Sequence, residues 1–198
     1  MKLLRREIWP RIRHQINNAR LHVYGAYPTK EILALNDSKL GFLVHGRIDD
    51  LDSELTKRRV LLAPLRYGAG IKGKIVDAWR CGLPVVSTPI GAEGMMYNDS
   101  EPWGGAVASN VDDFVEASVS MYTQIATWDN AQKQSIGLLN KLFNKKNNFN
   151  LVETAVQNAI AEQKQRRTHD LTSAVLWHQN LRSTRYFSKW VELKETMR

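Results

Sequence analysis

A glycine-rich segment of this chain reads Gly68-Ala-Gly-Ile-Lys-Gly-Lys-Ile-Val-Asp-Ala-Trp79. The segment satisfies two phosphate-binding patterns at once, on the same glycines. Gly68, Gly70 and Gly73 have the G-x-G-x-x-G spacing of dinucleotide-binding loops. Gly68, Gly73 and Lys74 also provide most of the G-x-x-x-x-G-K spacing of triphosphate-binding loops. The residues on either side of the glycines decide what such a loop binds.

Neither of the two patterns is completed by its flanking sequence. The triphosphate pattern requires a Ser or Thr after the lysine to ligate Mg²⁺, and Ile75 stands there. The dinucleotide pattern requires its first glycine directly after a strand, but residues 64–67 intervene. It also requires an acid at the end of the next strand, which reads Val86-Ser-Thr-Pro89. Both interpretations are therefore disfavoured.

A third interpretation takes the cations around the glycines into account. Arg66, Lys72 and Lys74 surround the loop at the mouth of an apolar strand and at the start of a helix. Glycines allow the backbone to approach an anion, the helix dipole favours negative charge, and the cations neutralise it. This combination predicts a diphosphate site without an obligatory protein-bound metal. Asp77, one turn into the helix, is placed to accept hydrogen bonds from a ribose.

Short apolar runs alternate with helical segments, which predicts βαβ units and a parallel sheet flanked by helices, an α/β fold. The loops at the carboxyl ends of such strands form the ligand-binding crevice. The predicted strands are Leu21–Tyr24, Leu40–His45, Val60–Ala63, Val85–Thr88 and Gly105–Ala108. The predicted helices are 10–18, Glu31–Asn36, Asp50–Arg58, Lys74–Cys81, Asp112–Ala126, Asn130–Phe143, Leu151–Arg166 and Leu171–Met197, with a loop over Pro89–Met95.

Composition excludes several classes of protein. One cysteine, Cys81, rules out an intrachain disulfide framework, and no apolar run is long enough for a signal peptide or a membrane helix. We therefore expect a soluble, cytoplasmic protein. The net charge of +8 is concentrated at residues 1–30 and 164–198, so the glycine loop lies in a mildly acidic body. No nucleic-acid module and no metal-ligand spacing of His, Cys, Asp or Glu is present, so neither nucleic acid nor a metal is expected.

The segment Ala63–Gly94 strongly resembles the donor-binding, C-terminal half of GT-B glycosyltransferases, and it is most similar to their retaining group 1 family. Glu7-Ile-Trp-Pro-Arg-Ile-Arg13 and Ala19-Arg-Leu-His-Val-Tyr-Gly25 also resemble the first helix and strand of that half. The resemblance covers roughly residues 7–125. It implies a Rossmann-like, nucleotide-sugar-binding domain, with the nucleotide diphosphate sugar as substrate and no cofactor.

The resemblance also implies roles for particular positions. Arg66 and Lys72 would contact the diphosphate and act in catalysis, and Asp77 would bind the ribose in place of the family's usual glutamate. A second glutamate of many members is Ala69 here, which removes one expected sugar contact. The full set of predicted donor-binding residues is Gly46, Arg47, Gly68, Gly70, Gly73, Lys74, Asp77, Gly91, Ala92 and Glu93, with Gly46 and Arg47 near the base.

We divide the chain into a nucleotide-sugar-binding domain, residues 1–166, and an amphipathic C-terminal helix, residues 167–198. GT-B enzymes have a second, N-terminal domain for the acceptor, so we expect a separate half or a homo-oligomer to complete the site. The last helix carries an apolar stripe that packs either on its own domain or on such a partner. The stripe comprises Leu171, Val175, His178, Leu181, Tyr186, Trp190, Leu193 and Met197.

Three functions remain open on the sequence. The chain is the donor half of a glycosyltransferase, a module that binds a nucleotide or nucleotide-sugar without transfer, or an interaction remnant with an unused site. The intact Arg66 and Lys72 argue against the third.

Overall fold

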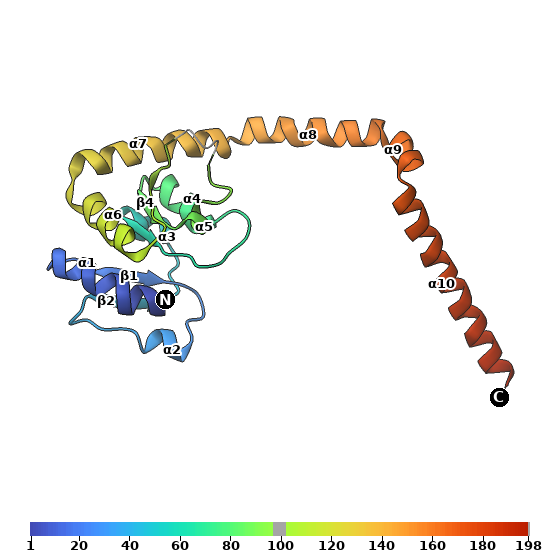
Figure 1. Cartoon of the computed structure of the whole chain (residues 1–198), viewed down its shortest axis with the longest axis horizontal. Helices are drawn as coiled ribbons and strands as arrows, with labels where there is room; N and C mark the ends of the chain where they lie inside the picture. The colour runs from blue at the N-terminus through green and yellow to red at the C-terminus, as the bar shows by residue number, and fades with distance from the viewer. Residues whose placement is uncertain (97–101, 198) are drawn as a thin grey trace. The chain divides into compact units, whose positions relative to one another are not determined.

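The predicted α/β fold forms around two sets of parallel strands. A computed structural model describes residues 1–96 and 102–197, and the chain separates into two units, Met1–Asn144 and Lys145–Arg198. The first unit holds the strands and the helices that flank them (Figure 1). Its strands are β1 Leu21–Tyr24, β2 Phe42–Gly46, β3 Leu61–Ala63, β4 Val85–Ser87 and β5 Gly105–Val107. All five strands lie within two residues of the predicted positions.

The helices of the first unit connect and cover these strands. Pro10 occupies an early position of α1, which continues directly from the π-helical turn η1. The helices are η1 Leu4–Ile8 (a π-helical turn), α1 Trp9–Gln15, α2 Lys30–Leu33, α3 Leu51–Thr56, α4 Gly73–Arg80, α5 Pro89–Ala92, α6 Val111–Thr123 and α7 Ile125–Leu142. A loop was predicted over Pro89–Met95, but its first 4 residues form the helical turn α5. Pro89 begins this turn, because its fixed φ suits a helix.

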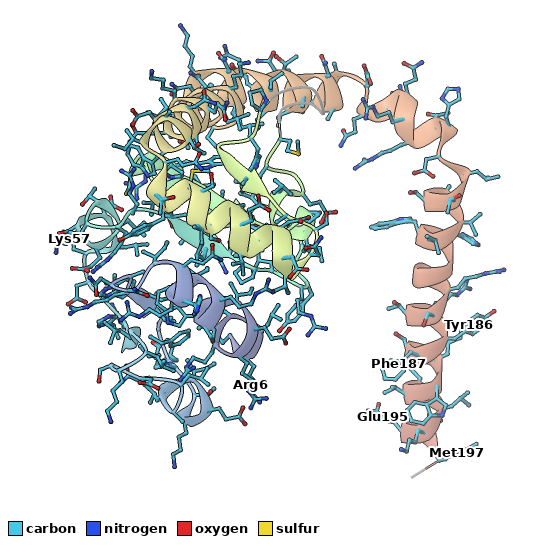
Figure 2. The ribbon with its side chains drawn as sticks, turned by 60° about the vertical axis from the view of Figure 1, so that its left-hand side comes forward. Arg6, Lys57, Tyr186, Phe187, Glu195 and Met197 are labelled. Atoms are coloured by element: carbon cyan, nitrogen blue, oxygen red, sulfur yellow. The ribbon has the colours of Figure 1, made fainter. Side chains whose placement is uncertain are left out.

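The described residues of the second unit form helices with short breaks between them. It contains α8 Lys145–Ala161, α9 Gln163–His169 and α10 Leu171–Thr196 (Figure 1). The single helix predicted over Leu151–Arg166 was wrong, because the chain leaves the α-helix at Glu162 before α9 begins. Asp170 caps α10 by accepting the Ser173 N–H at 2.9 Å. Large side chains stand off the surface of α10 (Figure 2).

The strands pair in two ladders rather than in one sheet. β1 pairs with β2, with Leu21 opposite Phe42. The order of the other sheet is β3-β4-β5, with Val85 opposite Leu61 on one side and Gly105 on the other. A cavity of about 420 Å³ is lined by residues of both β1 and β3, so these two strands are separated where a continuous sheet would pair them. In both ladders the strands are parallel, as predicted.

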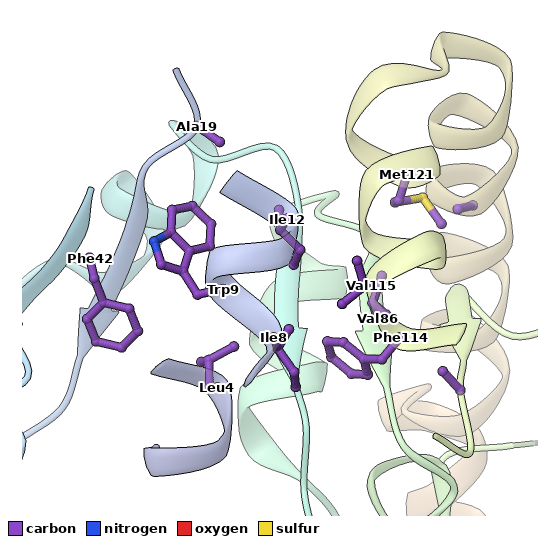
Figure 3. Packing of buried hydrophobic residues seen from close by; sticks show 12 residues of the cluster. Leu4, Ile8, Trp9, Ile12, Ala19, Phe42, Val86, Phe114, Val115 and Met121 are labelled. Carbon is purple, nitrogen blue, oxygen red and sulfur yellow. The ribbon is translucent and has the colours of Figure 1, made fainter. Parts of the chain in front are cut away.

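One apolar core joins the N-terminal helices to both ladders. Ile8 and Ile12 of the N-terminal turns lie between the β1–β2 sheet, represented by Phe42, and Phe114 of α6 (Figure 3). Trp9 is buried in the same cluster, and its indole N–H donates to the Leu40 carbonyl at 2.7 Å. Through the bond from Trp9 to Leu40, this core fixes the chain just before β2 begins at Phe42.

A second core surrounds Trp79 of α4. The Trp79 ring is fully buried, meets Trp103 edge-to-face at 5.4 Å, and donates its N–H to the Gly104 carbonyl at 2.9 Å. Gly105 has φ +148°, and a Cβ there would lie 1.8 Å from the Val85 carbonyl oxygen. The close pairing of β4 and β5 therefore depends on glycine at this position.

We predict that Gly105→Ala destabilises the chain by about 2–5 kcal/mol, because the new methyl group collides with the β4 backbone at a positive φ. The free energy of unfolding in urea measures the loss. Gly137→Ala is the matched control, since Gly137 lies inside α7 with no atom within 4 Å of its missing Cβ. That control should stabilise the chain by up to about 1 kcal/mol. Equal stability of the two variants would contradict the packing described for Gly105.

Candidate functional site

The glycine loop is held by hydrogen bonds between the ends of β3 and β4. The Ser87 hydroxyl donates to the Ala63 carbonyl at 3.1 Å, and the Thr88 hydroxyl donates to the Leu65 carbonyl at 2.5 Å. These bonds fix the chain where it leaves β3, three residues before Gly68. The loop therefore stands at the carboxyl edge of the parallel sheet, where such folds bind ligands.

Lys72 lies beneath this loop, at the N-cap position of α4. The residue is 6% exposed, and its Nζ donates to the Glu93 carbonyl at 3.3 Å. A Cβ on Gly68 would lie 3.8 Å from Lys72 Cε, which places the lysine stem against the loop. Within the described residues no carboxylate pairs with this ammonium. The group therefore has three donors and one rather long bond to a neutral acceptor.

The backbone around Lys72 is open to an approaching group. Gly70 has φ +66°, and neither Gly70 nor Gly73 has an atom within 4 Å of its missing Cβ. The N–H groups of Gly73 and Lys74 donate to no backbone carbonyl of the described chain, whereas the Ile75 N–H bonds to Lys72 O at 2.8 Å. Free N–H groups at a helix N-terminus attract anions. The predicted combination of glycines, a helix start and a lysine is thus present in three dimensions.

Arg66 is exposed and makes no hydrogen bond or ion pair with the described residues. It lines a cavity of about 400 Å³ together with Thr88 and Pro89 after β4 and with Asn110 at the start of α6. The cavity is thus bordered by the ends of three parallel strands. Arg66 extends the positive charge of the loop to this side.

Lys74 and Asp77 face a different cavity, the one between the two ladders. The Asp77 carboxylate lies 3.6 Å from Arg80 Nη2, and Arg80 in turn makes two hydrogen bonds of 2.5 Å to Asp52 of α3. Asp77 is therefore engaged with a cation of its own helix. A ribose hydroxyl would have to compete with Arg80 for this carboxylate.

The loop after β4 contributes mostly backbone. Gly91 and Ala92 are buried in α5, and a Cβ on Gly91 would lie 1.9 Å from Ser87 Oγ. Glu93 follows α5, and its carbonyl oxygen is the acceptor for Lys72. The structure therefore brings Glu93 to the glycine loop through its backbone oxygen, while Gly91 and Ala92 pack the turn.

Gly46 and Arg47 lie at the end of β2, apart from this group. Gly46 has φ +77°, which turns the chain out of the strand, and exposed Arg47 approaches Asp49 at 3.9 Å. Across the described residues, no hydrogen bond or ion pair links either residue to the glycine loop. Their predicted contact with a base stays a prediction.

Sequence reasoning missed a polar cluster on the β1–β2 sheet. Arg58 Nη2 donates to both Tyr24 (2.7 Å) and Glu54 (2.6 Å), and the Tyr24 hydroxyl donates to Glu54 at 2.8 Å. Hydrogen bonds from Lys57, Tyr24 and Arg58 hold the pKa of Glu54 down to about 2. Burial and its bond to Glu54 raise the pKa of Tyr24. The spacing Glu54–Arg58 could have signalled a helical ion pair, but its contact with Tyr24 depends on the fold.

Two histidines extend this cluster along the sheet. His22 Nδ1 and His45 Nε2 are 2.9 Å apart and the two ring planes differ by 5°, so one ring donates to the other. This bond requires at least one neutral imidazole. Burial, then the positive charge of Arg58 and the neighbouring His45, lower the pKa of His22, and Arg20 acts in the same direction. Glu54 opposes them.

The described residues contain neither a metal-binding cluster nor a membrane-spanning helix. Among residues 1–96 and 102–197, no group of three or more His, Cys, Asp or Glu side chains is arranged to hold a metal ion. No helix in the described part of the chain has the length and apolar character needed to cross a membrane.

Comparison with known proteins now identifies the family. The family model for group 1 glycosyl transferases matches residues 1–124, which include both ladders and the glycine loop. The chain belongs to the group 1 glycosyltransferase family. This match confirms the resemblance of Ala63–Gly94 to group 1 glycosyltransferases at the level of the family. Residues 125–198 lie outside the match.

Solved structures add a more distant likeness. A chain in the crystal structure of a GtfA/B complex is 16% identical, with a TM-score of 0.47 over 68% of this chain. The match spans 29% of that longer chain, less than a third of its length. The comparison with curated proteins finds no match.

We predict that the chain becomes less stable as pH falls below about 6.5, because His22 binds a proton less readily when folded than when unfolded. The stabilising effect is complete above the unfolded pKa and is lost as pH falls through the lowered pKa of the folded state. Unfolding in urea at about pH 7.5 and about pH 5.5 measures the difference. His22→Gln should flatten this dependence.

The control for this measurement is His14→Gln, which removes an exposed histidine of α1 outside the cluster. Its pH dependence should match that of the parent chain. If His22→Gln and the parent lost equal stability on acidification, the lowered pKa assigned to His22 would be wrong.

Proposed function

We propose that this chain binds the nucleoside diphosphate sugar of a glycosyl transfer reaction, with the diphosphate on the glycine loop. Membership of the group 1 family supports glycosyl transfer as the general type of reaction. The donor-binding assignment rests on the residues themselves and goes beyond that membership.

The observation that carries the proposal is the burial of Lys72. A buried ammonium group with one neutral acceptor at 3.3 Å lacks the pairing that buried charges normally have. It lies next to the free Gly73 and Lys74 N–H groups at the start of α4 and under the open backbone of Gly70. A diphosphate would satisfy all of these donors together. This arrangement supports an anion better than it supports a structural role for the lysine.

The same donors would act on the reaction. In glycosyl transfer the bond between the sugar and the diphosphate breaks, and negative charge develops on the departing phosphate. Lys72, the helix N-terminus and Arg66 would stabilise that charge electrostatically, without transferring a proton. Arg66 is free to turn toward the phosphate, since it has no partner in the described structure.

The remaining contacts are proposed from the same geometry. Asp77 would accept a ribose hydroxyl after Arg80 shifts toward Asp52, its second partner. The Glu93 loop would lie near the sugar, and Gly46 with Arg47 would receive the base. Retention of configuration at the sugar carbon and an acceptor site on a separate N-terminal half are further parts of the proposal, taken from the family resemblance.

We predict that Lys72→Met weakens the binding of nucleoside diphosphates by about 1.5–3 kcal/mol, roughly 10- to 150-fold in dissociation constant. Methionine keeps most of the buried volume but removes the charge. Calorimetric titration of the full chain with UDP, GDP and ADP measures the change and identifies the preferred base. Lys72→Ala should show the same loss of affinity.

The matched control is Lys133→Met, which removes an exposed cation from α7 and should leave affinity unchanged. Nucleoside diphosphate binding that survives Lys72→Met would contradict the proposal. Binding without any transfer to sugar acceptors, even with an N-terminal half supplied, would instead favour a non-catalytic binding module.

Asp77→Asn provides a separate prediction about the ribose. We expect this variant to bind nucleoside diphosphates about tenfold more weakly, because a charged acceptor for the ribose hydroxyls is lost. Inorganic pyrophosphate, which has no ribose, should bind the variant as it binds the parent chain. Asp129→Asn, an exposed carboxylate on α7, is the control. A parallel loss of pyrophosphate binding would show that Asp77 acts through the loop rather than on the ribose.

A further inference from the structure

The second half of α10 exposes a continuous set of large apolar side chains. The exposed fractions lie between 55% and 84% for Tyr186, Phe187, Trp190, Leu193 and Met197. Tyr186, Phe187 and Met197 stand off the helix in Figure 2. Three of the five side chains are aromatic, and such rings favour positions with one apolar and one wet side.

The spacing of these residues places most of them on one face. Tyr186, Trp190, Leu193 and Met197 follow one another at intervals of four, three and four residues, the repeat of a helix face. Phe187 broadens the face on one side. Arg185, Ser188, Glu192 and Glu195 occupy the opposite side of the same turns.

Cations flank this apolar face on both sides. Arg182 and Lys189 follow one flank, and Lys194 lies on the other. The Lys194 ammonium lies 4.8 Å from the centre of the Trp190 ring, so its stem runs along the apolar surface while its charge reaches the edge. Residues 164–198 contain eight Lys or Arg against three acids. The apolar face is thus framed by positive charge.

This charge pattern disfavours a second copy of the chain as the partner. In a parallel pair of helices joined along Tyr186, Trp190, Leu193 and Met197, Lys189 of one chain would face Lys194 of the other. The two lysines are five residues apart, which is the spacing of the positions that meet across such a seam. Like charges would therefore repel where a stable dimer has opposite ones.

A negatively charged lipid surface fits the same pattern. No described helix can cross a membrane, and Arg182, Arg185 and Lys189 interrupt the middle of α10. A helix with aromatic and aliphatic residues on one side and lysine or arginine beside them lies in the plane of the membrane interface. Each lysine or arginine near an anionic surface adds to the attraction.

We propose that the C-terminal half of α10 binds the surface of a bilayer containing anionic phospholipid. Trp190, Leu193 and Met197 enter the boundary between headgroups and acyl chains, with Tyr186 and Phe187 beside them. Arg182, Lys189 and Lys194 contact the lipid phosphates. These residues belong to the second unit and the glycine loop to the first, so the proposal holds whether or not that loop binds a nucleotide.

The test is co-sedimentation of the full chain with vesicles. Phosphatidylcholine vesicles that also contain phosphatidylglycerol should bind the chain, and added salt should release it. Vesicles of phosphatidylcholine alone should bind it at least about tenfold more weakly. Equal binding to both kinds of vesicle, or binding to neither, would overturn the proposal.

Two double variants locate the surface. Lys189→Glu with Lys194→Glu should weaken binding to the anionic vesicles at least about tenfold, and so should Trp190→Ser with Leu193→Ser. Because these side chains are exposed, the variants should keep the helical circular dichroism and the unfolding midpoint of the parent. Unchanged vesicle binding in either variant would contradict the assignment.

Matched controls carry the same changes elsewhere. Lys30→Glu with Lys133→Glu reverses two exposed cations of the first unit, and Phe149→Ser with Leu151→Ser removes two exposed apolar residues of α8. Both should bind vesicles within about twofold of the parent, since the contact is local. If the chain self-associates without binding vesicles, and Trp190→Ser with Leu193→Ser abolishes that self-association, the face would be assigned to a second copy. A lower unfolding midpoint in that variant, again without vesicle binding, would assign it to the chain's own first unit.

Discussion

The hydrogen bond from the Trp79 indole to the Gly104 carbonyl fixes the helix on which the candidate site depends. It is buried, and it connects α4, whose first residue is Gly73, to the strand at the far side of the sheet. The indole can reach that carbonyl because Gly104 has no side chain, since a Cβ there would lie 2.8 Å from Trp79 Nε1. This bond anchors α4 near its C-terminal end. Because the helix is rigid, the anchor also fixes its first residue, Gly73, at the glycine loop, where the N–H groups of Gly73 and Lys74 donate to no described backbone carbonyl.

Much of the fold could be predicted from local sequence signals. The apolar run at Val85–Val86, with Pro84 before it and Pro89 shortly after it, indicated a strand directly. The signals failed where a distant contact decides the local structure. Leu40 was predicted within a strand, but its N–H bonds to the Asp37 carboxylate and its carbonyl to Trp9, so β2 begins at Phe42. The separation of β1 from β3 into two ladders likewise depends on tertiary structure that no single segment encodes.

The candidate site was predictable in its residue types but not in its contacts. The lysine, the glycines and the helix start all lie within Gly68–Gly73, so their proximity is local. The bond from Lys72 to Glu93 O spans 21 residues and depends on the turn of α5. The pair of His22 and His45 depends on strand register in the same way, since a shift by one residue would turn one ring to the opposite face. The spacing of these residues along the sequence therefore predicts neither the bond from Lys72 to Glu93 nor the pair of His22 and His45.

The burial of Lys72 lowers the stability of the unliganded fold at a residue that is proposed to bind the ligand. An ammonium group removed from water and given one neutral acceptor costs solvation free energy that the unliganded chain does not recover. An apolar side chain of similar size would pack there without this cost, as at many binding sites where stronger folding comes at the expense of activity. An anion bound there, as proposed, would remove this penalty. On that proposal the lysine would make resistance to unfolding conditional on occupancy, and the abundance of the folded chain would follow the supply of its ligand.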